Sequence, residues 1–144
     1  MKKKITLEII CFLFIFLFTY AAVMKLMDVE KFIVQIGQSP LLTKFAELVA
    51  WVIPAAELLI AGMLAFPRFR SIGLYMAFSL MVMFTAYIVA ILQFSEKIPC
   101  ACGGVLDSMG WTQHLIFNIG FVVLALIGII LHTPLQRNNQ VVRD

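Results

Sequence analysis

Residues 72–94 have the sequence IGLYMAFSLMVMFTAYIVAILQF, a run without a single charged side chain. An α-helix of about 20 apolar residues is long enough to cross the hydrocarbon core of a bilayer. Three more stretches meet the same requirement, namely residues 5–24, 45–66 and 112–131. The sequence therefore predicts an all-α membrane protein built as a bundle of four transmembrane helices.

The composition leaves little chain for a domain outside the membrane. Of the 144 residues, 62% are hydrophobic and 13% are charged, whereas ordinary globular domains have about half and about a quarter. We expect residues 1–144 to form one domain whose main partner is the lipid bilayer. Residues 5–24 exceed the roughly 7 to 15 apolar residues of a secretory signal, so we expect a retained helix. A net charge of only +3 argues against a nucleic-acid partner.

The distribution of basic residues predicts the orientation. Loops on the cytoplasmic side of membrane proteins carry an excess of Lys and Arg. If the N-terminus is cytoplasmic, that side holds Lys2, Lys3, Lys4, Arg68, Arg70, Arg137 and Arg143. The opposite side then holds Lys25, Lys31, Lys44 and Lys97. The excess predicts that both termini, and the basic connection that carries Arg68 and Arg70, lie on the cytoplasmic side of a bacterial membrane.

Two connections on the outer side differ in character. Within residues 25–44, an amphipathic segment places Phe32, Ile33, Ile36 and Leu41 where they could lie on the membrane surface. Residues 95–111 instead hold one proline and three glycines, the densest turn signals in the chain. After the fourth predicted helix, residues 132–144 form a tail, and we expect its polar part from residue 136 onward to be frayed.

Cys100 and Cys102 form a C-x-C pair in the turn-rich outer connection, within residues 99–104 (PCACGG). In a bacterial cell that face is the periplasm, where disulfides form and persist. Bridging residues two apart forces unusual geometry, which makes a disulfide easier to reduce. Such a labile bond is typically catalytic, and so short a loop gives little stabilisation. The pair therefore indicates thiol–disulfide redox chemistry.

A metal site is the competing interpretation. Cys100, Cys102 and His114 offer three soft ligands that suit copper or zinc. Zinc sites more often use longer Cys spacings and a second ligand pair, which the chain lacks. The third cysteine, Cys11, lies among Phe and Ile residues in the cytoplasmic half of the first predicted helix. There a buried thiol behaves as a small hydrophobe.

One acidic side chain lies deep in a predicted helix. Glu57 is near the middle of residues 45–66, and a carboxylate at that depth is costly, so it is a functional candidate that faces the bundle. Pro54, one turn earlier, is expected to kink the helix and to free a backbone carbonyl. The structural alternative is that Glu57 hydrogen-bonds Tyr87, Asn118 or that carbonyl.

Other polar residues lie near the outer ends of the predicted helices. His114 and Asn118 are four residues apart and share a helix face. His114 either orients or activates a cysteine thiol or faces the lipid headgroups. Lys25 and Glu47 lie on the same side of the membrane, and the sequence allows a structural ion pair between them.

Three motifs together resemble the MauE/DoxX-like family of redox-associated membrane proteins, and in particular its MauE group. They are residues 21–28 (AAVMKLMD), residues 54–62 (PAAELLIAG) and residues 99–104 (PCACGG), the last followed by Trp111 and Asn118. The resemblance extends over residues 5–131. Each motif is loose, but their order within four helices is specific. Proteins of the DoxX type are similar in the first two helices and typically lack the cysteine pair.

The resemblance implies a four-helix bundle that helps to form disulfides during maturation of a periplasmic enzyme, which for MauE is methylamine dehydrogenase. By position, Cys100 and Cys102 would be the redox pair, with Lys25, Pro54, Glu57 and Asn118 as motif positions. Disulfide-generating enzymes that relay electrons to quinone use two cysteine pairs. Here the third cysteine lies on the far side, so the outer pair would exchange with a partner thiol or a bound quinone.

The interpretation that combines these observations is a thiol–disulfide oxidoreductase of the bacterial inner membrane, with a thioredoxin-like or client protein as its periplasmic partner. His114, Glu57 and Asn118 would shape a polar pocket beneath the loop. The two alternatives are a copper- or zinc-handling protein and a non-catalytic scaffold subunit of a membrane complex.

Overall fold

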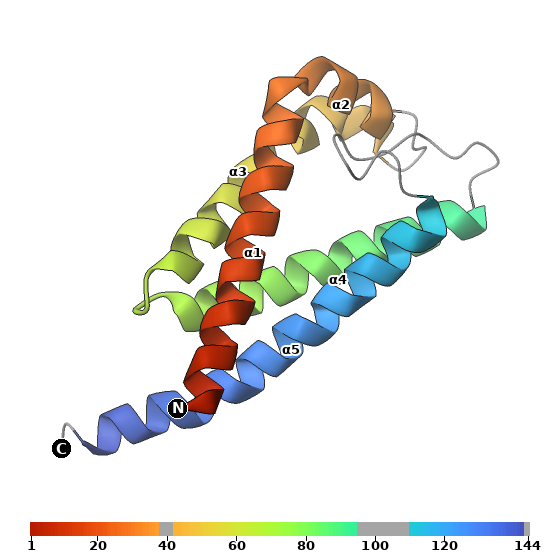
Figure 1. Cartoon of the computed structure of the whole chain (residues 1–144). Helices are drawn as coiled ribbons and strands as arrows, with labels where there is room; N and C mark the ends of the chain where they lie inside the picture. Colours follow the sequence, from red (N-terminus) through yellow and green to blue (C-terminus); the bar gives the residue numbers. More distant parts are fainter. Residues whose placement is uncertain (38–41, 95–109, 143–144) are drawn as a thin grey trace.

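The protein is described by a computed structural model that covers residues 1–37, 42–94 and 110–142, and these residues form helices and no strand (Figure 1). The elements are α1 (Lys2–Met27), α2 (Val29–Gly37), the short 3-10 helix η1 (Thr43–Phe45), α3 (Ala46–Ala65), α4 (Arg70–Phe94) and α5 (Trp111–Val141). Among the described residues, four helices are long and apolar enough to cross a membrane, α1, α3, α4 and α5. This confirms the predicted all-α membrane fold.

The last helix is longer than the sequence analysis predicts. α5 continues to Val141, so the expectation of a frayed tail is wrong for residues 136–141. Pro134 lies inside this helix although proline lacks a backbone N–H. One residue earlier, the Thr133 hydroxyl donates a hydrogen bond to the Ile129 carbonyl at 3.0 Å. The polar composition of the tail lowers helix propensity only slightly, so the helix that begins in the apolar segment propagates through it.

α2 packs on the first turns of α3. Its Phe32 and Ile33 pack against a small cluster of buried residues formed by Ile36, Ala46 and Ala50. The two alanines belong to the first turns of α3, and their small side chains let α2 approach that helix closely. The apolar residues of α2 therefore contact α3, the position of this segment relative to the membrane surface stays a prediction, and Leu41 lies outside the described part of the chain.

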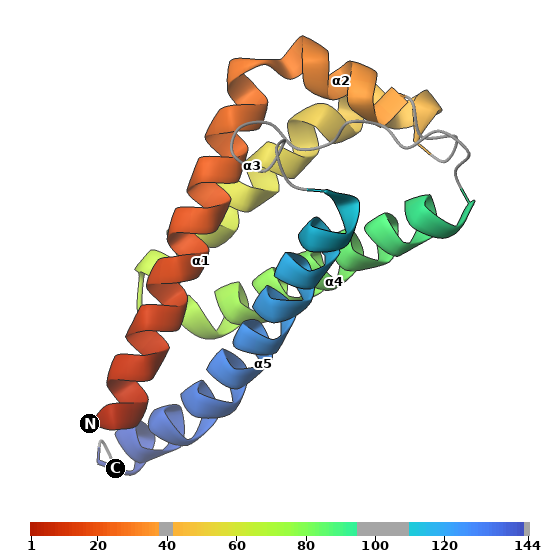
Figure 2. The ribbon, with the colours of Figure 1, turned by 45° about the vertical axis from the view of Figure 1, so that its right-hand side comes forward.

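The four long helices form two pairs that meet at one end. α1 packs along α3, and α4 packs along α5. Figures 1 and 2 show that the two pairs converge at the end that holds both chain termini and separate towards the end that holds α2 and the start of α5. We call the region between the separated pairs the wedge. It is bounded by α1 and α3 on one side and by α4 and α5 on the other.

Two glycines account for the close approach at the converging end. A Cβ atom at Gly73 of α4 would lie 3.0 Å from Leu64 Cδ2 of α3. A Cβ atom at Gly128 of α5 would lie 3.1 Å from Leu74 Cδ2 and 3.3 Å from Ile10 Cγ2, which belong to α4 and α1. In lipid, helices associate mainly through van der Waals packing, which small residues bring about by letting backbones approach.

Aromatic rings take the place of small residues where the two pairs begin to separate. Phe14 of α1 meets Phe121 of α5 edge to face, with ring centroids 5.2 Å apart. Phe18 stacks on Phe14 at 5.7 Å, and Phe117 lies 4.8 Å from Phe121. These bulky side chains fill the base of the wedge, and the distance between the helix pairs follows from their size.

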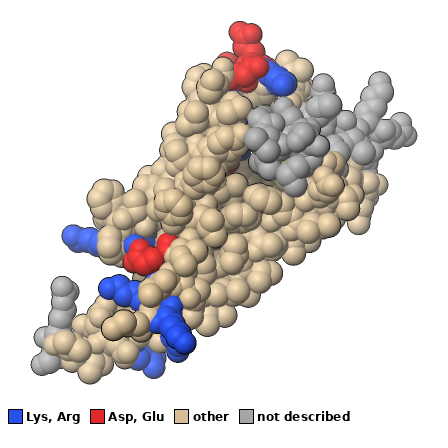
Figure 3. Space-filling model, in the orientation of Figure 1, with Lys and Arg blue, Asp and Glu red and all other residues tan. Residues whose placement is uncertain are grey.

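The outer surface of the helices is apolar, as lipid contact requires. Large hydrophobic side chains such as Phe12, Phe16, Leu59 and Ile130 are exposed, whereas Cys11 is buried in the core as the sequence predicts. In Figure 3, a group of Lys and Arg side chains lies at the end that holds both termini. The termini therefore share one end of the bundle, and which side of the membrane that end faces stays a prediction.

We expect Gly128→Val to lower the free energy of unfolding by about 1 to 3 kcal/mol, because the added atoms overpack the contact with Leu74 and Ile10. Gly120→Val is the matched control. It introduces the same residue into the same helix, at a position with no atom within 4 Å of the added Cβ. Unfolding of both variants in mild detergent, followed by circular dichroism, measures the difference. Equal stabilities would contradict the packing role of Gly128.

Candidate functional site

Four polar or charged side chains are buried among the described residues, and they come from three helices. They are Lys25 of α1, Glu57 of α3, and His114 and Asn118 of α5. Each was singled out from the sequence as a candidate, and Lys25, Glu57 and His114 interact within one site. We call these four residues the polar cluster. The other buried side chains that the structure describes in α1, α3 and α5 are apolar. The polar cluster is therefore the polar part of an otherwise apolar interior of these three helices.

Lys25 and Glu57 form a buried ion pair between α1 and α3. Lys25 Nζ lies 2.5 Å from Glu57 Oε1, and the two side chains are only 9% and 1% exposed. The pairing with Glu47 that the sequence allows is wrong, because Glu47 is exposed at the start of α3. Side chains on a helix tilt towards its N-terminus, so Lys25 extends down along α1 into the bundle and away from the level of Glu47.

The ammonium of Lys25 lies near side chains from several helices. It lies 5.7 Å from the centroid of the Phe32 ring in α2 and 5.4 Å from that of the Phe84 ring in α4. It is also close enough to His114 of α5 to interact with it electrostatically. Aromatic faces carry partial negative charge that attracts a cation, and burial strengthens the attraction. One charge thus contacts groups from α2, α3 and α4 and acts on α5.

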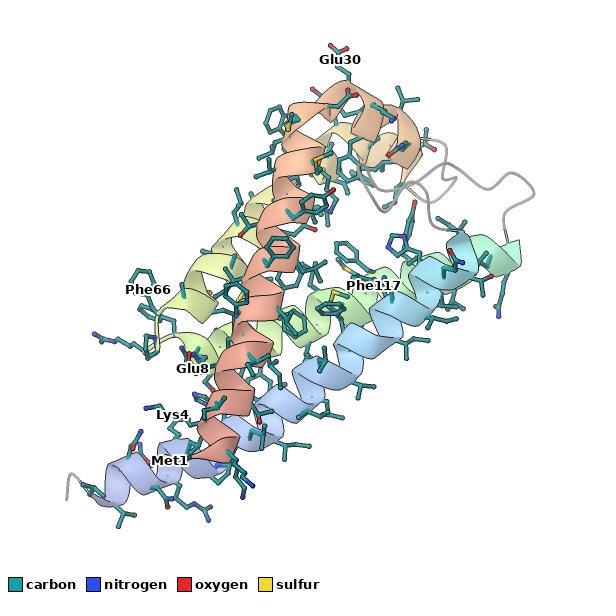
Figure 4. The ribbon with its side chains drawn as sticks, viewed as in Figure 1. Met1, Lys4, Glu8, Glu30, Phe66 and Phe117 are labelled. Atoms are coloured by element: carbon teal, nitrogen blue, oxygen red, sulfur yellow. The ribbon has the colours of Figure 1, made fainter. Side chains whose placement is uncertain are left out.

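The position of His114 and Asn118 in the polar cluster is set by the residue at which α5 begins. The Gly110 N–H donates to Gln113 Oε1 at 3.3 Å, and the His114 N–H donates to the Gly110 carbonyl at 2.9 Å. His114 therefore lies in the first turn and Asn118 in the next, on one face with Phe117 and Phe121. Figure 4 shows Phe117 on the side of α5 that faces α1. Because His114 is buried, its predicted alternative position among the lipid headgroups is wrong.

Two atoms of the polar cluster are buried without a hydrogen-bond partner, Glu57 Oε2 and Asn118 Nδ2. One is an acceptor and the other a donor. Asn118, one of the possible partners of Glu57 in the structural alternative, therefore does not donate to it, and Glu57 Oε1 accepts from Lys25 Nζ. Leaving a buried polar atom unpaired costs about 1 to 3 kcal/mol, so both atoms are available to bind a ligand or water.

Pro54 lies one turn before Glu57 and is buried inside α3, which continues uninterrupted from Ala46 to Ala65. Because proline has no N–H, the carbonyl of Ala50 loses its usual helical donor. Ala50, Pro54 and Glu57 are all buried, so Pro54 lies on the same interior face of α3 as the other two residues.

The predicted redox pair and the metal alternative depend on residues that the structure does not describe. Cys100 and Cys102 lie outside the described ranges, between the end of α4 and the start of α5. Within those ranges, no three His, Cys, Asp or Glu residues group as metal ligands. His114, the described member of the proposed metal set, lies near the Lys25 ammonium, whose positive charge disfavours a second cation beside it. Both interpretations of the cysteines stay predictions.

Sequence reasoning missed a second ion pair between helices that are distant in the chain. Arg70 Nη1 of α4 lies 2.9 Å from Glu8 Oε1 of α1, and Nη2 lies 3.4 Å from Oε2. Glu8, labelled in Figure 4, is half exposed near the end that holds the termini. An acidic residue in an otherwise apolar first helix was the available signal. The partner was hidden because 62 positions separate the two residues.

Comparison with known families explains why these motifs occur together. The profile of the family described as methylamine utilisation protein MauE matches residues 3–131. The chain belongs to the MauE family. This match includes the three motifs and all four residues of the polar cluster. No match is found among curated proteins or among solved structures.

In this MauE-family protein, we expect Lys25→Met to lower the free energy of unfolding by about 3 to 5 kcal/mol, because it leaves the Glu57 carboxylate buried and unpaired. The double variant Lys25→Met, Glu57→Leu removes both charges and is expected to recover most of that loss.

The exposed ion pair supplies the control for this measurement. Glu8→Gln is expected to cost less than about 1 kcal/mol, since half of the Glu8 side chain is in contact with solvent. Unfolding in mild detergent ranks the three variants. A Lys25→Met variant as stable as Glu8→Gln would show that the buried pair does not support the fold.

Proposed function

We propose that this membrane protein of the MauE family carries out thiol–disulfide exchange through Cys100 and Cys102. The observation that carries the proposal is the C-x-C pair in the connection between α4 and α5, in a chain that matches the family over residues 3–131. The connection leads directly into α5 (Figure 1), and His114 of the polar cluster lies in the first turn of that helix, where its N–H donates to the Gly110 carbonyl. This common location supports a joint role for the pair and the cluster.

The proposed reaction starts with the pair oxidised. A thiolate of the partner attacks one sulfur of the Cys100–Cys102 disulfide, forming a mixed disulfide and releasing the other cysteine as a thiolate. A second thiolate of the partner then attacks the mixed disulfide. The partner leaves with a new disulfide, and the pair has gained two electrons. Run in reverse, the same steps reduce a partner disulfide.

The partner we propose is a periplasmic protein with a pair of cysteines, either a thioredoxin-like carrier or the enzyme whose disulfides are being formed. The family description names methylamine utilisation, which suggests maturation of a periplasmic enzyme of that process as the role in the named member. We place this chain in the bacterial cytoplasmic membrane with the pair on the outer face. Support comes from Lys2, Lys3 and Lys4 at the end that holds both termini.

The exchange reaction predicts that single substitutions trap the partner. In Cys100→Ser or Cys102→Ser, the remaining thiolate attacks a disulfide of the partner, forms a mixed disulfide and releases one partner thiolate, and the missing second cysteine cannot resolve the adduct. We expect at least one of the two variants to accumulate a covalent adduct that disappears on reduction, as seen on non-reducing gels of cells. Cys11→Ser is the control, because that buried thiol lies in the half of α1 that begins at the N-terminus. Absence of an adduct from both variants would refute the exchange function.

The proposed orientation has its own test. In a Cys11→Ser background, we expect a membrane-impermeant maleimide to label Cys100 and Cys102 in intact cells after mild reduction. The reverse background, Cys100→Ser with Cys102→Ser, keeps only the buried Cys11 and should stay unlabelled. Labelling of the pair only after the cells are opened would place the loop on the cytoplasmic side.

A further inference from the structure

We infer that the polar cluster binds the oxygen-bearing ring of a lipid-soluble quinone, which accepts electrons from the reduced pair. This inference rests on the proposed function, because it names the electron acceptor of that exchange site. The residues that carry it are Asn118, Glu57 and Lys25, together with the aromatic rings beside them.

The first argument is the unmatched hydrogen-bonding capacity of the polar cluster. Asn118 Nδ2 is a donor and Glu57 Oε2 is an acceptor, and both are buried without a partner in side chains only 4% and 1% exposed. A ligand at Asn118 must accept a hydrogen bond, and a ligand at Glu57 must donate one. A quinone carbonyl accepts from an amide N–H, and the hydroxyl of the corresponding quinol donates to a carboxylate.

The second argument is the apolar surroundings of these atoms. Phe32 and Phe84 flank the Lys25 ammonium, and Phe117 and Phe121 share the face of α5 that carries Asn118. Flat apolar rings stack favourably on aromatic side chains. The helices around the polar cluster expose apolar side chains, so a ligand that dissolves in the bilayer meets these helices directly from the lipid.

The third argument is the electron balance of the redox cycle. Oxidation of the two thiols forms the S–S bond and releases two electrons and two protons. A quinone takes up both electrons and both protons, forming two O–H bonds and leaving as the quinol. The third thiol of the chain, Cys11, is buried in the part of α1 near the N-terminus, so a second internal disulfide is not the acceptor.

The test measures binding to the purified full-length protein in nanodiscs, with decylubiquinone and menadione as the probes. The Cys100→Ser, Cys102→Ser double variant is used so that neither thiol of the pair reacts with the probe, and the one remaining thiol, Cys11, is buried. We expect saturable binding of at least one probe by isothermal titration calorimetry. Asn118→Leu in this background should weaken binding at least tenfold, because it removes the donor.

Asn138→Leu is the matched control, since it makes the same change on an exposed position of the same helix and should bind like the parent. If Asn118→Leu does not fold, Asn118→Asp, which keeps the shape of the side chain and removes the amide donor, replaces it. No saturable binding to the parent, or equal binding by the Asn118 and Asn138 variants, would overturn the inference and assign the unpaired atoms to water.

The outcome is separable from that of the exchange function. Trapping of a partner by Cys100→Ser or Cys102→Ser without any quinone binding would leave the exchange function intact and refute the quinone site. Quinone binding without trapping would support the quinone site and refute the exchange function. The two results are independent because the protein in the binding assay contains neither cysteine of the pair.

Discussion

A buried ion pair in hydrocarbon is the constraint on which the rest of this structure depends. Neither Lys25 nor Glu57 is stable as a lone charge within a bilayer, so each requires the other, and the pair fixes α1 against α3. The Lys25 ammonium then attracts the rings of Phe32 and Phe84, which brings α2 and α4 to the same point. Replacing a buried ion pair by apolar residues often leaves stability unchanged, so we ascribe to this pair the arrangement of α1 against α3 and of the polar cluster.

The side chains change systematically from one end of the bundle to the other, and the wedge follows from this change. Gly73 and Gly128 allow the helices to approach closely at the end that holds the termini. Phe14 and Phe121 separate the two pairs at the next level. The polar cluster lies beyond the rings, towards the start of α5, where the connection that carries Cys100 and Cys102 joins the bundle. Glycine thus allows close packing at one end of the bundle, phenylalanine separates the helix pairs at the next level, and His114 of the polar cluster lies in the first turn of α5.

The sequence predicted the four spans and every member of the polar cluster. It did not predict which residues the charged members pair with. The spans were predictable because length and hydropathy are local properties. Glu57 and Asn118 could be identified as candidates because a polar side chain within an apolar span has an unfavourable free energy in the membrane, whichever way the helix is turned. The pairing of Lys25 with Glu57 instead of Glu47 was not, because it depends on the relative depth of α1 and α3. The same reason hid the contact between Glu8 and Arg70, and the packing of α2 on α3.

The amino-acid sequence by itself determined that this chain is a four-span membrane protein with one C-x-C pair and a few costly polar residues within its helices. Those conclusions depend on transfer free energies and spacing, which each segment carries alone. Only the tertiary structure decided that Lys25, Glu57 and His114 interact, that His114 is buried, and that Glu57 Oε2 and Asn118 Nδ2 stay unpaired. Such facts arise from how deeply one helix lies against another, and no single helix contains that information.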